Sequence, residues 1–533
     1  MLPARLRLAL RGAAPARSAG RNAPIRSAVV LAGLVTLVAC GDGSADPGEP
    51  AVPSDAANAT GAAERAPGAS EPSGAALDPS RPGWRPNVVV YLIDTLRADR
   101  LGLYGHDRDT SPTIDAVGAE SAVFERTYSQ GPWTLPSVMS LFTSAYPTSH
   151  EMVSATFSLN ESARTLTEWF AEQGYATAGF VHNTLGGKGS GLDQGYEHFV
   201  EKPPQRDMTD EMRAQGLHTM RPIMDYIRGY DDERPFFTYI HTVEPHWPYE
   251  GTIPDREPWT DTDPASWPEL NELVYEQRVL VQQASAVGLT EDERARLLAG
   301  QLDTVWDLYD ADIRRADVGV RRVTTALQAT GHWDDTIFLL LSDHGEEFLE
   351  HGFWFHDQSV YEELVHVPFV LRVPGLTDAG ARIDTPVQLL DVAPTLADLL
   401  GQPAWPQWQG RSLVPLLTDP RAAEDWPSAI TMRINVDREM GGDRGDRETA
   451  LVRGQHKLIL HHDHEHTRLF DLAADPGEQH DLSAQQPGRA ESLRRELFDR
   501  VRGLRPLGIR DQQEHSDELR QHLIELGYVE DDG

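Results

Sequence analysis

The sequence predicts an α/β protein with a large, mostly parallel central sheet and a small antiparallel subdomain near the C-terminus. Unbroken apolar runs at 87–93, 235–240 and 336–341 are typical of strands buried on both faces, as in a parallel sheet. Segments with helical periodicity, at 165–173 and 291–330, alternate with these strands. At 533 residues the chain is also too long for a single core, so a second, smaller unit is expected.

The first 39 residues have the organisation of an export signal. Arginines and no acidic residue precede the apolar run at 28–39, which is too short to cross a bilayer as a helix. The run ends in LVACG, which resembles a bacterial lipobox and implies cleavage before Cys40 and lipidation of its thiol. A plain secretory signal with an incidental cysteine is the alternative. We therefore expect a cell-envelope lipoprotein, anchored to a membrane, whose folded part faces the periplasm or the exterior.

A linker and a catalytic domain are expected to follow the signal peptide of 1–39. Residues 40–85 are rich in Gly, Ala, Pro and Ser and contain almost no large apolar residue, so they predict a disordered tether. The catalytic domain is assigned to 86–415. Within it, the stretch 255–330 is expected to form a helical cap over one edge of the sheet.

The C-terminal subdomain is assigned to 416–505. Its small antiparallel sheet and one covering helix are predicted from strand-like segments at 450–453, 457–461 and 468–472 and a helical segment at 488–504. The histidine-rich stretch 461–466 could bind metal, but it lies at the tip of the expected hairpin, where a polar turn is the more frequent outcome. The tail at 506–533 is expected to hold a short charged helix, from 511 onward, and an acidic end.

Charge and cysteine content exclude several functional classes. The chain has 48 basic and 83 acidic residues, a formal net charge of −35. This balance argues against binding nucleic acid or anionic lipid through bulk charge, and we attribute it to solubility or to adaptation to salt. Because Cys40 is the single cysteine, a disulfide framework, a zinc-finger spacing and a cysteine nucleophile in the folded part are all excluded.

Two of the predicted strands end in an aspartate, Asp94 and Asp343. Ligands of open α/β sheets bind beyond the carboxyl ends of the strands, so the two carboxylates could converge there. Together with the imidazole of His344 they would suit a divalent cation. An aspartate at a strand end can also simply cap the following helix, which for a single residue is the commoner outcome.

Thr134 precedes Pro136 at the start of a predicted helix. A hydroxyl at a helix N-terminus lies where the helix dipole favours an anion, and with a metal nearby it could act as an alkoxide nucleophile. The same stretch fits an ordinary threonine N-cap with proline in the first turn.

Seven segments resemble, in order, the motifs of the sulfatase family of the alkaline phosphatase superfamily, from about residue 87 to 482. They are NVVVYLIDTLRADRLGLYGH, PWTLPSVMSLFTSAYPTSH, YIHTVEPHWPY, LSDHGEEFLEHGFW, VYEELVHVPFVLRVPG, LLDVAPTLADLLG and LFDLAADPGEQHDL. The resemblance implies an alkaline-phosphatase-like sandwich fold and a hydrolase of sulfate or phosphate esters, with the substrate carried by a glycan or a lipid among the candidates. It also implies one divalent metal ion, Ca, Mg, Mn or Zn.

The resemblance assigns roles to individual residues. It implies that Asp94, Asp343 and His344 are metal ligands, and that Thr134 occupies the position of the family's formylglycine and also contacts the metal. His344 shifts the choice of metal away from calcium.

Several histidines are assigned in the same way. His246 matches the histidine that contacts the ester or protonates the leaving group, and His356 stands where the family usually has a lysine. His182, with Thr184, follows a looser match and is a further catalytic candidate. We interpret three other histidines of these segments, His241, His351 and His366, as packed or hydrogen-bonded side chains.

Three departures from the family pattern bear on the substrate. Thr134 cannot become formylglycine, Val138 replaces the arginine of the nucleophile motif, and Thr95 replaces the second aspartate of the first metal loop. A threonyl sulfate would be a stable alkyl ester, whereas a threonyl phosphate can be resolved by attack at phosphorus. Loss of the arginine, and of the lysine at His356, favours a monoanionic phosphodiester over a dianion.

Three functions stay open on the sequence alone. The first is a metal-dependent ester hydrolase, with phosphate esters favoured. The second is a transferase of the phosphoethanolamine or phosphoglycerol type, which would require an acceptor. The third is an inactive homologue that binds glycan or lipid, although the joint retention of Asp94, Asp343, His344 and a hydroxyl at 134 argues against a decayed site.

Overall fold

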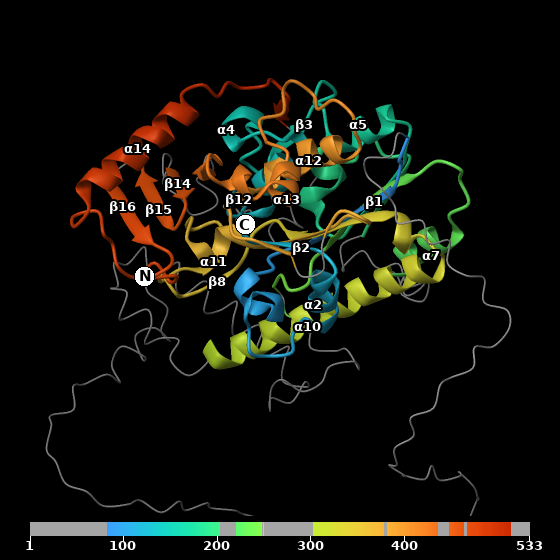
Figure 1. Ribbon diagram of the computed structural model, residues 1–533, viewed down its shortest axis with the longest axis horizontal. Helices are drawn as coiled ribbons and strands as arrows, with labels where there is room; N and C mark the ends of the chain where they lie inside the picture. Colours follow the sequence, from blue (N-terminus) through green and yellow to red (C-terminus); the bar gives the residue numbers. More distant parts are fainter. Residues whose placement is uncertain are drawn as a thin grey trace, which may run out of the picture. The chain divides into compact units, whose positions relative to one another are not determined.

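The computed structural model describes residues 83–202, 220–247, 249, 302–377, 381–434, 447–462 and 466–512, all within the unit that spans 73–533 (Figure 1). The described residues do not include the expected signal peptide at 1–39, Cys40 or almost all of the linker at 40–85. The part of the expected cap that precedes residue 302 also lies outside them. Among the described helices, none has both the length and the apolar character needed to span a membrane.

A nine-stranded sheet forms the centre of this unit. Its order is β11 (Ala381–Ile383), β2 (Ala122–Tyr128), β10 (His366–Arg372), β7 (Thr336–Ser342), β1 (Asn87–Ile93), β6 (Phe236–Thr242), β4 (Ala176–Val181) and β5 (His198–Glu201), and β12 (Val387–Gln388) pairs with β2. All pairs from β7 to β5 are parallel, whereas β10 is antiparallel to both β7 and β2. The prediction of a mostly parallel central sheet is confirmed.

Strand β1 places the first aspartate in the middle of the sheet. Every residue of β1 is buried, which explains its unbroken apolar sequence. Ile93 is in register with Ser342 of β7, so the next residues, Asp94 and Asp343, leave the sheet side by side at its carboxyl edge.

Successive side chains along the strands point to opposite faces of the sheet and pack into two separate hydrophobic cores, one on each face. One face packs against α2 (Pro112–Ala119), α7 (Arg221–Gly229) and α10 (Leu302–Ala329). The other packs against α3 (Thr134–Thr143), α5 (Leu166–Glu172) and α12 (Val392–Leu399).

Helix α10 corrects one expectation, because it lies over a face of the sheet and not over an edge. Its Val305, Leu308 and Tyr309 share a core with Val89 and Tyr91 of the central strand β1. A Cβ atom on Gly319 of α10 would lie 2.7 Å from the Tyr91 hydroxyl, so the helix approaches this strand closely. The apolar stripe of the helix is therefore used against the sheet face.

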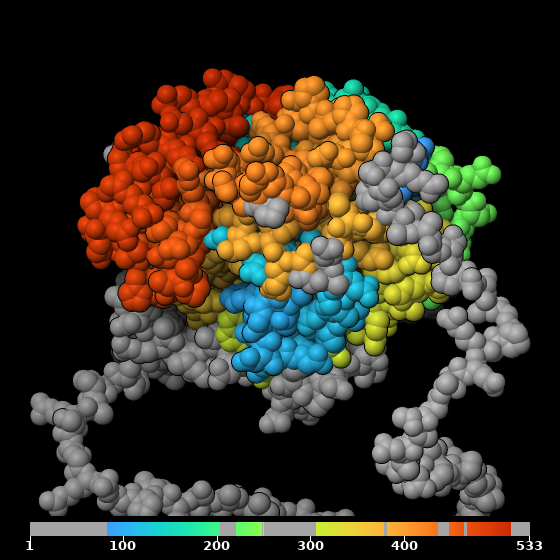
Figure 2. Space-filling view, in the orientation of Figure 1, coloured from blue at the N-terminus to red at the C-terminus, as the bar shows by residue number. Residues whose placement is uncertain are grey.

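The C-terminal sheet has the antiparallel order β13 (Ala429–Ile434), β14 (Arg447–Arg453), β15 (His456–His461) and β16 (His466–Asp471). Helix α14 (Pro487–Val501) covers it through Ala490, Leu493 and Leu497. Figure 2 shows the red residues of this subdomain gathered in one region of the surface. The predicted sheet with one helix is confirmed, and β13 is an additional strand that the sequence analysis did not identify.

Two details near the C-terminus concern earlier expectations. His461 pairs with His466 at the end of the β15–β16 hairpin, as the turn interpretation of this stretch requires, although 463–465 lie outside the described residues. The helix expected from 511 onward is wrong at its start, because β17 (Arg510–Gln512) is a strand that pairs with β3 (Phe157–Leu159). Pairing satisfies the backbone of this short edge strand.

Candidate active site

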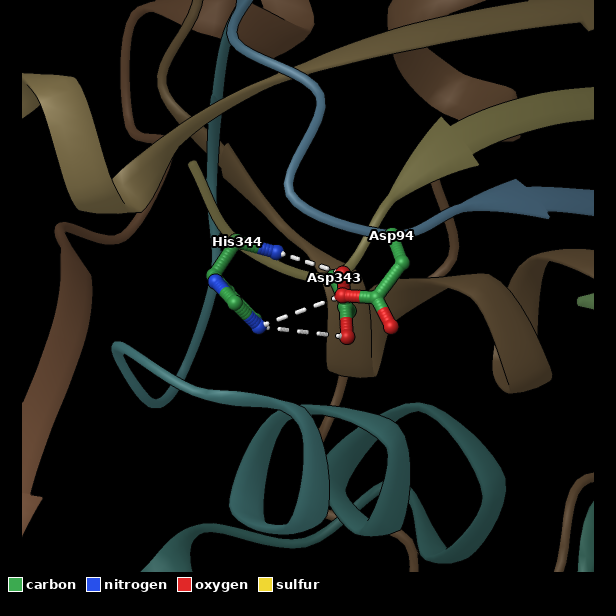
Figure 3. Close-up of side chains that lie close together, drawn as sticks. All are labelled: Asp94, Asp343 and His344. Atoms are coloured by element: carbon green, nitrogen blue, oxygen red, sulfur yellow. Dashed lines mark hydrogen bonds and ion pairs between the residues drawn. The ribbon is translucent and has the colours of Figure 1, made fainter. Parts of the chain in front are cut away.

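Asp94, Asp343 and His344 converge at the carboxyl edge of the central sheet. All three are fully buried, and Figure 3 shows them pointing toward one another. His344 Nε2 lies 3.5 Å from Asp94 Oδ1 and 3.5 Å from Asp343 Oδ2. One potential ligand atom from each residue falls within 4.8 Å of the others.

The donor set fits a divalent cation. Within the described residues, neither Asp94 Oδ1 nor Asp343 Oδ2 has a hydrogen-bond partner, although both atoms are buried. His344 Nδ1 lies 2.9 Å from the carbonyl oxygen of Gly345, to which it donates, so Nε2 presents its lone pair to the two carboxylates. Buried polar atoms left without partners are rare, and a cation would satisfy both oxygens.

The ionisation of the two aspartates points the same way. Burial alone would raise the pKa of Asp94. Three neighbouring histidines, His241, His246 and His344, nevertheless hold that pKa below its usual range, and His241 Nε2 lies 3.4 Å from Asp94 Oδ2. Burial and the charge of Asp94 raise the pKa of Asp343 well above its usual range. Two carboxylates this close resist joint ionisation, and a cation between them removes the conflict. His241, interpreted from the sequence as a packed or hydrogen-bonded histidine, thus lies next to a candidate metal ligand.

The hydroxyl of Thr134 lies beside this cluster. Its Oγ1 is 3.3 Å from His344 Nε2, and the residue is fully buried. Helix α3 begins at Thr134, and its N-cap is Trp133, without a side-chain capping bond. The alternative of a threonine N-cap is therefore wrong, because Thr134 is the first helical residue and its hydroxyl faces the cluster.

Asn183 is a site residue that the sequence analysis missed. Its Oδ1 accepts a hydrogen bond from the Leu185 amide, at 2.9 Å, which fixes the orientation of the side-chain amide. Its Nδ2 then donates to Asp94 Oδ2 at 2.6 Å and to Thr134 Oγ1 at 3.3 Å. Its position just after the carboxyl end of β4, in the same parallel sheet, is the signal that could have found it.

The structure also brings His246 and His356 to the site. Their rings lie 5.2 Å apart, and the His356 ring lies 4.7 Å from that of His344. His356 Nδ1 is 2.8 Å from Glu346 Oε1, and His246 Nδ1 is 2.5 Å from the carbonyl oxygen of Trp247. Each ring is therefore held through Nδ1.

His182 differs from the other catalytic candidates. No hydrogen bond or ion pair of the described residues joins its side chain to Thr134 or to the metal cluster, and its Nδ1 is buried without a partner. Burial, reinforced by the positive charge of Lys202, lowers the pKa of His182 to about 3. The ring is therefore neutral near pH 7 and unsuited to donate a proton.

Two of the departures from the family motifs have visible structural consequences. Val138 lies in α3 and is fully buried in the core, so this position places no positive charge one helical turn from the Thr134 hydroxyl. Thr95 has φ of 54°, an uncommon conformation for a β-branched residue, and its amide donates to Asp343 Oδ1 at 3.3 Å. The strained backbone thus orients a candidate metal ligand.

Comparison with known proteins identifies the family. Residues 86–402 match the family described as Sulfatase, and residues 349–506 match N-sulphoglucosamine sulphohydrolase, C-terminal. The chain is 24% identical to an arylsulfatase of Clostridium perfringens over 474 residues (79% of this chain, 95% of that protein). It is 24% identical to a choline-sulfatase of Rhizobium meliloti over 469 residues (78% and 86%).

Solved structures agree on the fold. The phosphonate monoester hydrolase of Agrobacterium radiobacter superposes with a TM-score of 0.62 at 20% identity, covering 79% of this chain and 96% of that one. A protein solved in complex with its substrate D-glucosamine-2-N,6-O-disulfate superposes with a TM-score of 0.60 at 19% identity, covering 78% and 98%. The chain belongs to the sulfatase family, a family of ester hydrolases with the alkaline-phosphatase-like fold.

Proposed function

We propose that the chain is an exported, metal-dependent ester hydrolase that uses Thr134 as its nucleophile and prefers phosphate esters, phosphodiesters above all, to sulfate esters. The observation that carries this proposal is the position of the Thr134 hydroxyl, buried at the N-terminus of α3 and 3.3 Å from His344 Nε2. A helix N-terminus stabilises negative charge that develops on such an oxygen.

Asp94, Asp343 and His344 would hold one divalent cation. When bound, such a cation polarises a non-bridging oxygen of the ester and lowers the pKa of a nearby hydroxyl. Asn183 donates to Thr134 Oγ1 and to Asp94 Oδ2 and so fixes the nucleophile relative to the ligand set.

The reaction itself is a double displacement. The Thr134 hydroxyl gives its proton to solvent and its Oγ1 attacks phosphorus; the bond to the leaving oxygen breaks, and that oxygen takes a proton from His356 or His246. Glu346 at Nδ1 of His356 stabilises the protonated ring and supports His356 as the donor. Water then gives a proton to the same histidine and attacks the threonyl ester at phosphorus; the bond between phosphorus and Thr134 Oγ1 breaks, and Oγ1 takes up a proton, which releases the product and restores the hydroxyl.

The preference for phosphorus rests on what Thr134 and its surroundings can do. A formylglycine releases sulfate by collapsing to an aldehyde, but a threonyl sulfate has no such exit, whereas a threonyl phosphate can be hydrolysed. Val138 supplies no positive charge, and Glu346 balances the charge of a protonated His356, which together favour a monoanionic diester over a dianion. The structural similarity to a phosphonate monoester hydrolase supports the same substrate class.

A substrate panel tests the proposal. The protein, loaded in turn with Mg²⁺, Mn²⁺, Ca²⁺ and Zn²⁺, is assayed with an aryl sulfate, an aryl phosphate monoester and a bis-aryl phosphodiester. We expect the phosphodiester to be turned over fastest and the sulfate least. Efficient sulfate turnover would contradict the argument from threonyl-ester chemistry. Turnover of a phosphodiester only in the presence of an alcohol acceptor would identify a transferase, and binding of glycan or lipid without any turnover would identify an inactive homologue.

A further inference from the structure

A second group of metal-ligating side chains lies outside the active site. It consists of Glu347, in β8 (Glu347–Phe348), His351, in the turn that follows, and Glu363, in α11 (Glu362–Val365). One potential ligand atom from each of the three lies within 4.8 Å of the others. Both carboxylate residues are buried, and the His351 side chain is 10% exposed.

Glu347 is the member of this group whose surroundings are incomplete. Its side chain is fully buried, and its Oε1 accepts a hydrogen bond from Ser359 Oγ at 3.1 Å. Its Oε2 is also buried but has no hydrogen-bond partner among the described residues. Burial, together with the charge of Glu363, raises the pKa of Glu347 well above its usual range. A buried carboxylate with a free oxygen is costly unless a cation or a proton completes its surroundings.

His351 directs one ring nitrogen into the group. Its Nδ1 lies 2.5 Å from Glu363 Oε1. Its Nε2 lies on the other side, 3.3 Å from both the carbonyl oxygen of Glu478 and Nε2 of Gln479. The ring is stacked on Tyr361 with centroids 3.5 Å apart and an interplanar angle of 4°, so its orientation is fixed. An imidazole held in this way on its outer nitrogen is the usual arrangement of a metal-ligating histidine.

The side-chain cations around the group are already paired. Arg97 donates to Asp99 and Glu350, and Lys457 donates to Glu362 and Glu478. Among the described residues, neither donates a hydrogen bond to Glu347. Glu363 is paired with His351, whose contact holds the pKa of this carboxyl below its usual range, so among the described residues Glu347 is the carboxylate of the group that no side-chain cation contacts.

We infer that Glu347, His351 and Glu363 bind a second divalent cation, separate from the one that Asp94, Asp343 and His344 would hold. One imidazole and two carboxylates suit Zn²⁺ or Mn²⁺, with water in the remaining positions. The three ligands bracket the segment that carries His356, so the cation ties this segment to α11 and acts on structure, not on the ester. His351, interpreted from the sequence as a packed or hydrogen-bonded histidine, is both in the structure, and this inference makes it a ligand as well.

Metal content measures this site without an activity assay. The full-length chain in detergent is stripped with a chelator and dialysed against Zn²⁺, and bound zinc is counted by mass spectrometry. We expect Glu347→Gln to hold one zinc fewer than the wild type and Asp94→Asn also to hold one fewer, because the two sites are independent. Glu350→Gln is the matched control: it removes a carboxylate of the same segment that is paired with Arg97, and it should retain the wild-type zinc content. Comparing variants also cancels any zinc bound by the histidines at 461–466.

A zinc content of Glu347→Gln equal to that of the wild type overturns the inference. Because a core variant can fail to fold, anomalous scattering at the zinc edge from wild-type crystals gives a second readout. We expect one peak beside Asp94 and another beside Glu347. A peak beside Asp94 with none beside Glu347 overturns the inference as well, and leaves the proposed reaction untouched.

Discussion

Asn183→Ala tests whether the residue that links metal ligand and nucleophile matters to the reaction. The substitution removes the 2.6 Å hydrogen bond to Asp94 Oδ2 and the 3.3 Å hydrogen bond to Thr134 Oγ1. Asn183 positions the nucleophile, and a misplacement of about 1 Å at a reacting atom can cost about 10²-fold in rate. The bond to Thr134 is longer than ideal, so we expect a fall of about 10- to 100-fold, or about 1.4–2.8 kcal/mol of transition-state stabilisation.

The same substitution should weaken metal binding. Asn183 donates to a carboxylate of the ligand set, and loss of such outer partners typically costs about 10- to 100-fold in metal affinity. The assays are kcat on a bis-aryl phosphodiester at saturating metal, and metal affinity from titration in a metal buffer. Asn160→Ala is the matched control, because Asn160 makes a comparable local turn, with Oδ1 accepting from the Ser162 amide, at an exposed site. If Asn183→Ala matched the control in both assays within twofold, the assigned positioning role would be wrong.

Two further predictions rest on the structure, and a third rests on the sequence of the expected export signal. His356→Asn should lower kcat by about 10²–10⁴-fold for esters with poor leaving groups and much less for aryl esters, because a good leaving group needs no proton. An equal loss of kcat for all leaving groups would contradict the role of His356 as the acid. His150 is fully buried, with Nδ1 accepting from the Met152 amide, and burial lowers its pKa to about 3. In the unfolded chain a histidine has a pKa of about 6.5, so as the pH falls the unfolded chain binds the proton before the folded one does. The free energy of unfolding should therefore fall below about pH 6.5, by about 2 kcal/mol at pH 5. In urea unfolding, His150→Gln should lose less of this free energy over the same pH range than the wild type. Cys40→Ser should release the protein from the membrane fraction of an expressing bacterium if the lipobox assignment holds, whereas an unchanged distribution after fractionation would favour a plain secretory signal.

The sequence predicted the central site because its residues follow a rule of parallel sheets. Asp94 and Asp343 each end an apolar run, and the carboxyl ends of parallel strands share one edge, so their convergence could be expected. Thr134 was accessible for a similar reason, since proline two residues later indicates a helix start. The motif resemblance added the positions of His246 and His356, which no periodicity would have indicated.

Other features depend on contacts between distant segments and were not predictable in this way. Asn183 acts on Thr134 and Asp94 through a side-chain orientation that the Leu185 amide fixes. A helix was expected from residue 511 onward, but residues 510–512 form a strand because they pair with β3. The unpaired oxygen of Glu347 becomes visible only when burial and partners are known, because its sequence neighbourhood resembles any acidic turn.

The most direct test of the central claim is kcat of Thr134→Val on the bis-aryl phosphodiester. Valine keeps the shape of threonine and removes only the hydroxyl, and Thr143→Val, at the other end of the same buried helix, controls for the loss of a buried hydroxyl there. If Thr134 is the nucleophile, its variant should lose at least about 10³-fold while the control stays within a few-fold of the wild type. Turnover by Thr134→Val within tenfold of the wild type would contradict the account.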